Sequence, residues 1–243
     1  MRRNKVLSVL TLAAFSMLFS ACSSKQYFEP EKTYSANSSS LGGSIADLSR
    51  DGATLKSGQY IGKSGVSSMN LGEDYRFLSE SRDYVLASNP KGVLNIIDKA
   101  SQESVRAVSL HIPVVSATIK NGIVAYILNN NTFGIYEVDG NRKVVESRSE
   151  RTFAIDTRAA SPMFIENLAV MPMLDGKLII VDSENSDNSK VVYISSDKAF
   201  NNVIFLSRID NTMVAATPKK IITLGAAGKQ EYRANISEVV VSN

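Results

Sequence analysis

The chain has 243 residues, of which 44% are hydrophobic, and this is sufficient for one large domain with a sizeable buried core. The formal net charge is +3, and three cations near the amino terminus account for it, because 24 basic and 24 acidic residues remain in the rest of the chain. The neutral remainder gives no electrostatic reason to expect nucleic acid as a partner, since such binding requires a basic face that displaces counterions.

The amino terminus has the pattern of a signal peptide. Residues Met1–Lys5 contain three cations, and the apolar run Val6–Phe19 that comes next is too short to span a bilayer comfortably. We therefore expect residues 1–21 to be a leader that is removed from the mature protein.

The end of the apolar run, Leu18-Phe-Ser-Ala-Cys22, resembles the lipobox of bacterial lipoproteins. Ser20, Ala21 and Cys22 match that pattern, and Phe19 stands where leucine is commonest. The resemblance implies cleavage between Ala21 and Cys22, diacylglycerol on the Cys22 thiol, and an acyl chain such as palmitate on the new amino terminus. Two or three acyl chains form a stable membrane anchor. An ordinary secretory leader cut near Ala21 is the alternative.

The residues around the expected anchor indicate the membrane that holds it and the nature of the adjoining segment. Cys22 is the only cysteine of the chain, so it cannot form an internal disulfide. In the lipoprotein sorting pattern, Asp directly after the acylated Cys retains the protein in the inner membrane, and this chain has Ser23 there. By that analogy we expect an outer-membrane lipoprotein that faces the periplasm of a Gram-negative bacterium. Residues 22–44, rich in Ser and Gly towards their end, are expected to form a flexible lipidated tether.

Residues 45–243 carry a repeat that predicts an all-β domain. The hairpin Val170–Asp182 turns at Asp175-Gly176, which is a strong signal for a tight turn between two strands. Its second strand has three relatives, which are Gly92–Asp98, Asn131–Glu137 and Lys219–Gly225. The positions that become equivalent lie 39, 45 and 43 residues apart, and they are Leu94, Phe133, Leu178 and Ile221. This period, carried by short strands, is typical of a β-propeller with four strands per blade.

The register of the repeat predicts about four recognisable four-stranded blades. The expected strands are Tyr75–Ser81, Tyr84–Ser88, Val93–Asp98 and Ser104–Leu110; Val114–Lys120, Ile123–Leu128, Phe133–Val138 and Lys143–Ser147; Pro162–Glu166, Leu168–Met173, Leu178–Asp182 and Lys190–Ile194; and Val203–Arg208, Met213–Ala216, Ile221–Leu224 and Gln230–Ile236. Before them, two strands are expected within Ser44–Gly65, around Ala53–Lys56 and Gln59–Gly62. After them, Ile236–Asn243 is typical of the first strand of another unit.

The number of units leaves more than one arrangement open. Either the strands within Ser44–Gly65 pair with Val239–Val241 and complete a five-bladed ring, or the chain is a shortened or partial form of a longer propeller. We predict the second arrangement. A solenoid-like open assembly is a third outcome. Wherever Val239–Val241 stayed unpaired, this apolar strand would expose ladder groups and apolar surface.

Within a unit, particular positions have expected roles. Leu178 and Ile180 share one face of a strand, and we expect that face to lie between adjacent blades, whereas Lys177 is expected to contribute little to stability. Residues that tolerate left-handed geometry stand before the third strand, in Asn89–Gly92, Asn129–Asn131 and Asp175-Gly176. The acids that close the third strand are expected to contact solvent and not to bind a metal; they are Asp98, Glu137 and Asp182.

The repeat and the lipobox together resemble the PQQ-type or WD40-like propeller lipoproteins of Gram-negative bacteria, the BamB type among them. The resemblance covers Tyr75–Asn243 and rests on the third-strand pattern and on Thr212–Gly225. It implies a lipid-anchored scaffold whose partner is an envelope protein complex, with outer-membrane protein assembly as the candidate process. No unit has the Trp-Asp ending of a WD40 blade or the Trp-rich motif of PQQ enzymes, and the chain contains no Trp, so we predict no cofactor.

No motif in the chain indicates catalysis. His111 is the only histidine, with no second His or Cys to share a metal and no identifiable Ser partner. Glu73 and Asp74 are adjacent and would face opposite sides of a strand. We therefore predict no catalytic residue, no metal site and a non-catalytic protein-interaction scaffold. The alternative is a small-ligand-binding or hydrolytic propeller that uses its central funnel, with carboxylates assembled from different blades.

Overall fold

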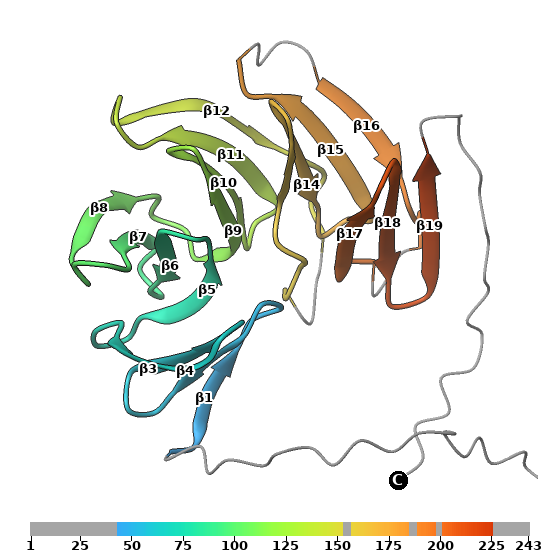
Figure 1. Ribbon diagram of the computed structural model, residues 1–243. Helices are drawn as coiled ribbons and strands as arrows, with labels where there is room; N and C mark the ends of the chain where they lie inside the picture. Colours follow the sequence, from blue (N-terminus) through green and yellow to red (C-terminus); the bar gives the residue numbers. More distant parts are fainter. Residues whose placement is uncertain (1–42, 153–156, 185–188, 198–200, 226–243) are drawn as a thin grey trace, which may run out of the picture. The chain divides into compact units, whose positions relative to one another are not determined.

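The computed structural model describes residues 43–152, 157–184, 189–197 and 201–225. Within these residues every helix or strand assigned is a β-strand, which agrees with the expected all-β class (Figure 1). The predicted leader, the tether up to residue 42, and the lipidation and cleavage residues Ala21 and Cys22 lie outside the described residues. The expected strands Gln230–Ile236 and Val239–Val241 also lie outside them.

The strands form five small antiparallel sheets, which we name A to E in chain order. Sheet A consists of β1 (Ile45–Leu48), β2 (Ala53–Leu55), β3 (Gln59–Gly62) and β4 (Gly65–Asn70). Sheet B consists of β5 (Arg76–Glu80), β6 (Tyr84–Ser88), β7 (Val93–Asp98) and β8 (Ser104–Ser109). Sheet C consists of β9 (Val114–Lys120), β10 (Ile123–Leu128), β11 (Thr132–Glu137) and β12 (Arg142–Arg148). Sheet D consists of β13 (Met163–Ile165), β14 (Leu168–Pro172), β15 (Lys177–Asp182) and β16 (Ser189–Tyr193). Sheet E consists of β17 (Phe205–Ile209), β18 (Thr212–Thr217) and β19 (Lys220–Gly225).

Each sheet is a meander in which consecutive strands pair, as expected for propeller blades. The register of the repeat is confirmed: β6, β7, β9 and β10 begin and end at the predicted residues, and the other strands of sheets B to E differ by one or two residues at an end. The predicted number of units is too small, because sheet A is a complete four-stranded unit. The sequence indicated only its two central strands, β2 and β3.

The turn before the third strand repeats the same backbone geometry in sheets A to D. Its last residue has a positive φ in each sheet, at Gly58 (84°), Gly92 (77°), Asn131 (65°) and Gly176 (80°). The carbonyl oxygen of this residue accepts a hydrogen bond from the residue directly after the fourth strand; the four donors are Leu71, Leu110, Ser149 and Ile194. Lys219 holds the equivalent position in sheet E and does not have a positive φ. The sequence has neither glycine nor asparagine at this position. Glycine and asparagine occupy the other four positions because they tolerate left-handed backbone.

Buried side chains between neighbouring sheets hold the domain together. We call the face of a sheet that points to the next sheet its forward face, and the opposite one its rear face. Separate apolar cores join A to B, B to C, C to D and D to E. The repeat-equivalent residues of the third strands all lie in these cores on the forward face; they are Tyr60, Leu94, Phe133 and Leu178. Ile180 is packed against the core between D and E, so the predicted inter-blade face of β15 is confirmed.

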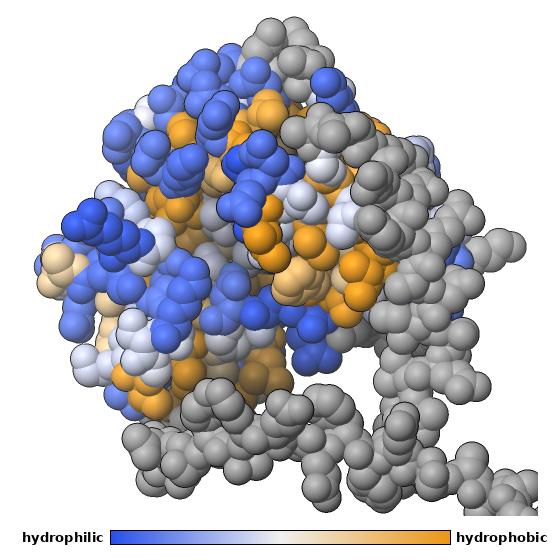
Figure 2. Space-filling model, turned by 45° about the vertical axis from the view of Figure 1, so that its right-hand side comes forward, coloured by the Kyte–Doolittle hydropathy of each residue, from blue (hydrophilic) through white to orange (hydrophobic). Residues whose placement is uncertain are grey.

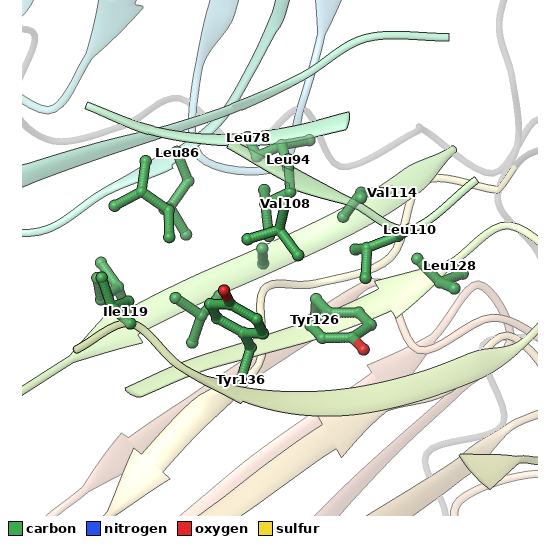
Figure 3. Close-up of a cluster of buried hydrophobic side chains, with 14 residues drawn as sticks. Leu78, Leu86, Leu94, Val108, Leu110, Val114, Ile119, Tyr126, Leu128 and Tyr136 are labelled. Carbon is green, nitrogen blue, oxygen red and sulfur yellow. The ribbon is translucent and has the colours of Figure 1, made fainter. Parts of the chain in front are cut away.

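The core between sheets B and C illustrates this packing (Figure 3). Leu86 and Leu94 from sheet B face Tyr126 and Tyr136 from sheet C. Tyr126 is fully buried and lies over Gly134 of the neighbouring strand, where a β-carbon would come within 2.3 Å of the phenol ring. Its hydroxyl donates a 2.6 Å hydrogen bond to Glu146, and burial together with that carboxylate raises the pKa of Tyr126. The outer strands β8, β12 and β16 are largely exposed, so the buried surface is concentrated on the inner strands.

The expectation for Lys177 is wrong. The residue is 6% exposed, and its ammonium group forms ion pairs with Asp175 (3.1 Å) and Glu150 (2.8 Å). The ammonium group also lies 5.5 Å from the ring centre of Tyr193. Lys177 lies on the rear face of β15 together with Ile179 and Val181, and this face is also covered, by sheet C. The carboxylates of Asp175 and Glu150 compensate the charge of its ammonium group.

Candidate functional site

The turns before the third strands and the connections between consecutive sheets lie on one side of the domain, which we call the turn face. The hydrogen bonds from the residue after each fourth strand to the turn residue of the same sheet place these segments next to each other. In propeller-like folds, loops on one rim gather residues from several blades, so this face is the first place to look for a site.

A pocket of about 740 Å³ opens on the turn face and is shared by sheets A, B and C. Its wall includes the β2–β3 turn (56–58), the connection from β4 to β5 (70–75), and single residues of the next turns, Asn89, Pro90 and Asn129. This volume is within the range of small-ligand pockets. The pocket is therefore assembled from residues up to about 100 positions apart in the chain.

Arg76 joins the inner strands of the three sheets at this pocket. One guanidinium nitrogen lies 3.6 Å from the carboxylate of Asp47 in β1, and another donates to the carbonyl oxygen of Val114 in β9. The side chains of Arg76 and Asp47 are 32% and 42% exposed, so solvent screens this ion pair and its contribution to stability is small. Through these contacts within the domain, Arg76 connects the three sheets that form the wall of the pocket.

The amide side chains at the pocket shape its loops. Asn70 donates to the carbonyl oxygen of Ser57 (2.8 Å) and accepts from the backbone N–H of Gly72 (2.8 Å). Asn89 accepts from the backbone N–H groups of Lys91 and Val93. These bonds hold the turns in place, because Asn side chains satisfy backbone groups that turns leave unpaired.

The charged residues at the rim of the pocket are Lys56, Glu73 and Asp74, and all three are exposed. Glu73 and Asp74 lie in the connection between β4 and β5 and not on a strand, so strand alternation does not separate them. The rim thus offers both signs of charge to a partner. The sequence did not single out this pocket, since its residues share no local motif.

Polar groups also link neighbouring turns further along the turn face. Asn131 is fully buried, accepts from the N–H of Leu174 (2.9 Å), and donates to the carbonyl oxygen of Glu150 (2.8 Å). Asp175 accepts from the Ser149 hydroxyl (2.6 Å) and from Lys177. Burial opposes the charged form of Lys177, but its hydrogen bonds to Glu150 and Asp175 and their charges outweigh burial and raise the pKa of Lys177. These hydrogen bonds and ion pairs connect sheets C and D.

The opposite rim holds the acids that end the third strands. Asp98 accepts hydrogen bonds from the N–H groups of Ala100 and Ser101 and from the Ser101 hydroxyl, and these bonds lower the pKa of Asp98. Glu137 pairs with Arg142 (2.6 Å), and Asp182 accepts from the N–H of Glu184. Each acid therefore organises its own turn, and the three belong to separate sheets.

One further residue considered in the sequence analysis is His111. His111 is exposed, has a φ of 60°, and its Nδ1 lies 3.4 Å from the Ser109 hydroxyl in the connection between sheets B and C. Within the described ranges, no three His, Cys, Asp or Glu side chains gather in a geometry that could hold a metal ion. Across the same ranges, no helix has the length and hydropathy needed to cross a membrane.

Comparison with known proteins adds two kinds of similarity. No protein-family model matches the chain. Two plasminogen-binding proteins, both called PgbB and from Helicobacter pylori strains 26695 and J99, are each 27% identical over an alignment that covers 98% of this chain. That alignment covers 52% of each PgbB protein, so the chain spans about half the length of these curated relatives.

Two solved structures resemble the described fold. BamB from Moraxella catarrhalis superposes with a TM-score of 0.61 at 15% identity, over 77% of this chain and 62% of that chain. The computationally designed Ika8 protein superposes with a TM-score of 0.56 at 15% identity, over 74% of this chain and 56% of that chain. At such identities the likeness shows the fold alone. The five sheets thus have a BamB-like, propeller-type arrangement, as predicted from the repeat.

Proposed function

We propose that the chain is a lipid-anchored, non-catalytic protein-interaction scaffold of the bacterial cell envelope. The observation that carries this proposal is the similarity to two proteins named for binding another protein, which extends over 98% of the chain. The turn face supports it, because its pocket is walled by side chains that are committed to hydrogen bonds within the domain, while charged residues of both signs surround the opening. Such a surface suits recognition of a polar protein segment.

The lipobox-like sequence at Cys22 supports the proposed location. Acylation of Cys22 would hold the domain at the outer membrane on its periplasmic side, with residues 22–44 as the tether. In this location the turn face would meet an envelope protein complex, and outer-membrane protein assembly is the process we propose on the strength of the BamB-like fold.

Co-purification of envelope proteins with the full acylated chain tests the proposal. A turn-face variant that combines Lys56→Glu with Glu73→Lys keeps the net charge and reverses the charge pattern at the pocket rim. Its matched control combines Arg82→Glu with Glu103→Lys, two exposed residues in loops on the opposite rim. We expect the turn-face variant to lose the co-purifying envelope protein and the control to retain it. If both variants retain the envelope protein, the scaffold proposal is contradicted. It is also contradicted if no envelope protein co-purifies specifically with the wild type.

The anchor is tested separately with Cys22→Ser. The wild type should incorporate labelled palmitate and fractionate with the outer membrane, and the variant should do neither because its thiol cannot accept diacylglycerol. An unlabelled wild type, or a Cys22→Ser variant that fractionates as before, contradicts lipid anchoring while leaving the interaction test unaffected.

Plasminogen binding is a second candidate function, and the PgbB similarity is the specific observation that favours it. We expect the purified chain to bind immobilised plasminogen in a saturable manner. Binding that is lost in the turn-face variant and retained in its control would place plasminogen on the turn face. No saturable binding by the wild type would restrict this function to the relatives.

A further inference from the structure

A second pocket lies on the rim opposite to the turn face, between sheets C and D, and we call it the C–D pocket. Its volume is about 580 Å³, which is within the range of small-ligand pockets. Its wall is formed by the ends of β9 and β11, the first residues of β10 and β12, the hairpin of β13 and β14, and the residues directly after β15. Every residue of this wall lies within the described ranges.

Three apolar side chains line the C–D pocket on the side of the core. Ile123 and Val144 come from sheet C and Phe164 comes from sheet D, and all three are half-buried and pack against the core that joins the two sheets. A ligand in the pocket therefore covers apolar surface that the core itself leaves accessible to water, and such burial favours binding.

Charged side chains of both signs line the same pocket. Figure 2 shows this combination across the molecular surface, where apolar residues are exposed in patches between hydrophilic ones. In the C–D pocket, Arg142 forms an ion pair with Glu137 at 2.6 Å. Lys120 is exposed, and its ammonium group donates to the backbone carbonyl oxygen of Glu166 at 3.4 Å. Among the described residues Lys120 has no acidic partner, so its charge is available to a ligand.

Two carboxylates of the pocket are available as well. Glu166 stands in the turn between β13 and β14, and Glu184 follows β15. The Ser183 hydroxyl donates to the carbonyl oxygen of Asn167 at 2.8 Å and holds these two segments together. Within the described part of the chain, neither glutamate side chain forms a hydrogen bond or an ion pair. A cationic group of a ligand can therefore pair with them without displacing an existing contact.

We propose that the C–D pocket binds a short peptide with apolar side chains and free amino and carboxyl ends. The ammonium group of the peptide pairs with Glu166, its carboxylate pairs with Lys120, and its side chains cover the three apolar residues. A ligand with two opposite charges and more than one apolar side chain complements this lining, because apolar surface comes from both sheets. The inference concerns a different rim from the turn face and does not depend on the scaffold function.

Isothermal titration calorimetry of the full acylated chain in a non-ionic detergent, with the dipeptide leucyl-phenylalanine as the probe, tests the proposal. The acetylated dipeptide lacks the ammonium group, and the amidated dipeptide lacks the carboxylate. We expect saturable one-to-one binding of the unmodified dipeptide. Each modified form should have a dissociation constant about tenfold higher, since it loses one charged contact.

Two variants assign each charge of the peptide to its partner. Lys120→Met should weaken binding of the unmodified dipeptide about tenfold and leave binding of the amidated form unchanged, because the carboxylate is already absent there. Glu166→Gln should weaken binding of the unmodified dipeptide and leave that of the acetylated form unchanged. The matched controls are Lys91→Met and Glu103→Gln, which change exposed residues of sheet B and should bind as the wild type does.

Two results overturn the proposal. One is the absence of saturable binding of the dipeptide to the wild type. The other is binding that neither pocket variant changes, because the peptide then occupies another site. Far-UV circular dichroism verifies that each variant is folded, and Lys120→Gln replaces Lys120→Met if that variant does not fold.

Discussion

Asn131 combines two roles that can be separated by substitution. Its backbone is left-handed, with a φ of 65°, and its buried side chain bridges the turns of sheets C and D through Leu174 and Glu150. Asn131→Gly keeps the backbone freedom and removes both bonds, so we expect a loss of about 2 to 3 kcal/mol in the free energy of unfolding. Asn131→Ala adds the cost of left-handed backbone and should lose about 1 kcal/mol more. Urea denaturation of both variants measures the difference, and equal losses would show that the φ carries no strain.

We expect Lys177 to contribute far more to the free energy of unfolding than an exposed lysine does. Lys177→Met removes the cation beside Asp175, whose side chain is 8% exposed, and leaves a buried carboxylate unpaired. Such a loss typically costs about 3 to 5 kcal/mol. The double variant Lys177→Met with Asp175→Asn should recover part of this loss, because the buried charge is also removed. Chemical denaturation measures both variants. A double variant less stable than Lys177→Met would contradict this account of the ion pair between Lys177 and Asp175.

Strand β15 depends on its forward face for stability. Leu178 is fully buried in the core between sheets D and E, and truncation of such a residue typically costs about 2 to 5 kcal/mol. Leu178→Ala should lower the urea midpoint clearly, whereas Val191→Ala on the exposed neighbouring strand β16 should leave it nearly unchanged. Similar effects of the two substitutions would mean that the forward face of sheet D is not packed.

The contact between sheets A and B should make stability depend on pH through Glu80. The Glu80 side chain is 7% exposed and accepts from Lys99 Nζ and from the N–H of Lys63, each at 2.7 Å. Burial opposes its charged form, but these bonds outweigh burial and lower the pKa of Glu80 below its usual value of 4.5. A lowered pKa in the folded state stabilises the fold above the unfolded-state value, and this contribution is lost as the pH falls through the folded-state value.

Denaturation of the wild type and of Glu80→Gln at a series of pH values measures this contribution. The wild type should lose stability more steeply than Glu80→Gln as the pH falls below about 4.5, the usual pKa of a glutamate. Parallel pH profiles of the two proteins would exclude Glu80 as the titrating group.

The chain of cores from sheet A to sheet E predicts that the sheets unfold together. Tyr60, Tyr126 and Tyr136 are buried in the cores of sheets A to C, and the chain has no Trp, so tyrosine fluorescence reports mainly that part. Far-UV circular dichroism reports all five sheets. Because loss of one sheet exposes the apolar face of the next, we expect the two signals to show one coincident transition. A separate early change in circular dichroism would show that sheets D and E unfold alone.

The local features of the fold could be predicted from the sequence. Strands of sheets B to E were recognised because alternation and turn residues act over a few neighbouring positions, as in Gly92, Asn131 and Gly176, where the backbone must be left-handed. The equivalence of Leu94, Phe133 and Leu178 was also evident from their spacing, and the structure places all three between sheets.

Features that depend on residues distant in the chain became clear only in three dimensions. Strands β1 and β4 are short and partly polar, and they become strands through pairing with β2 and β3, so sheet A was only half recognised. Lys177 is buried on the face of β15 that packs against sheet C, and Glu150, from another segment, forms an ion pair with it. The turn-face pocket needs three sheets to exist, and no local pattern encodes such a surface. The amino-acid pattern alone thus specifies the repeat and its register, while packing between sheets dictates which faces are covered, since burial is a property of neighbours in space.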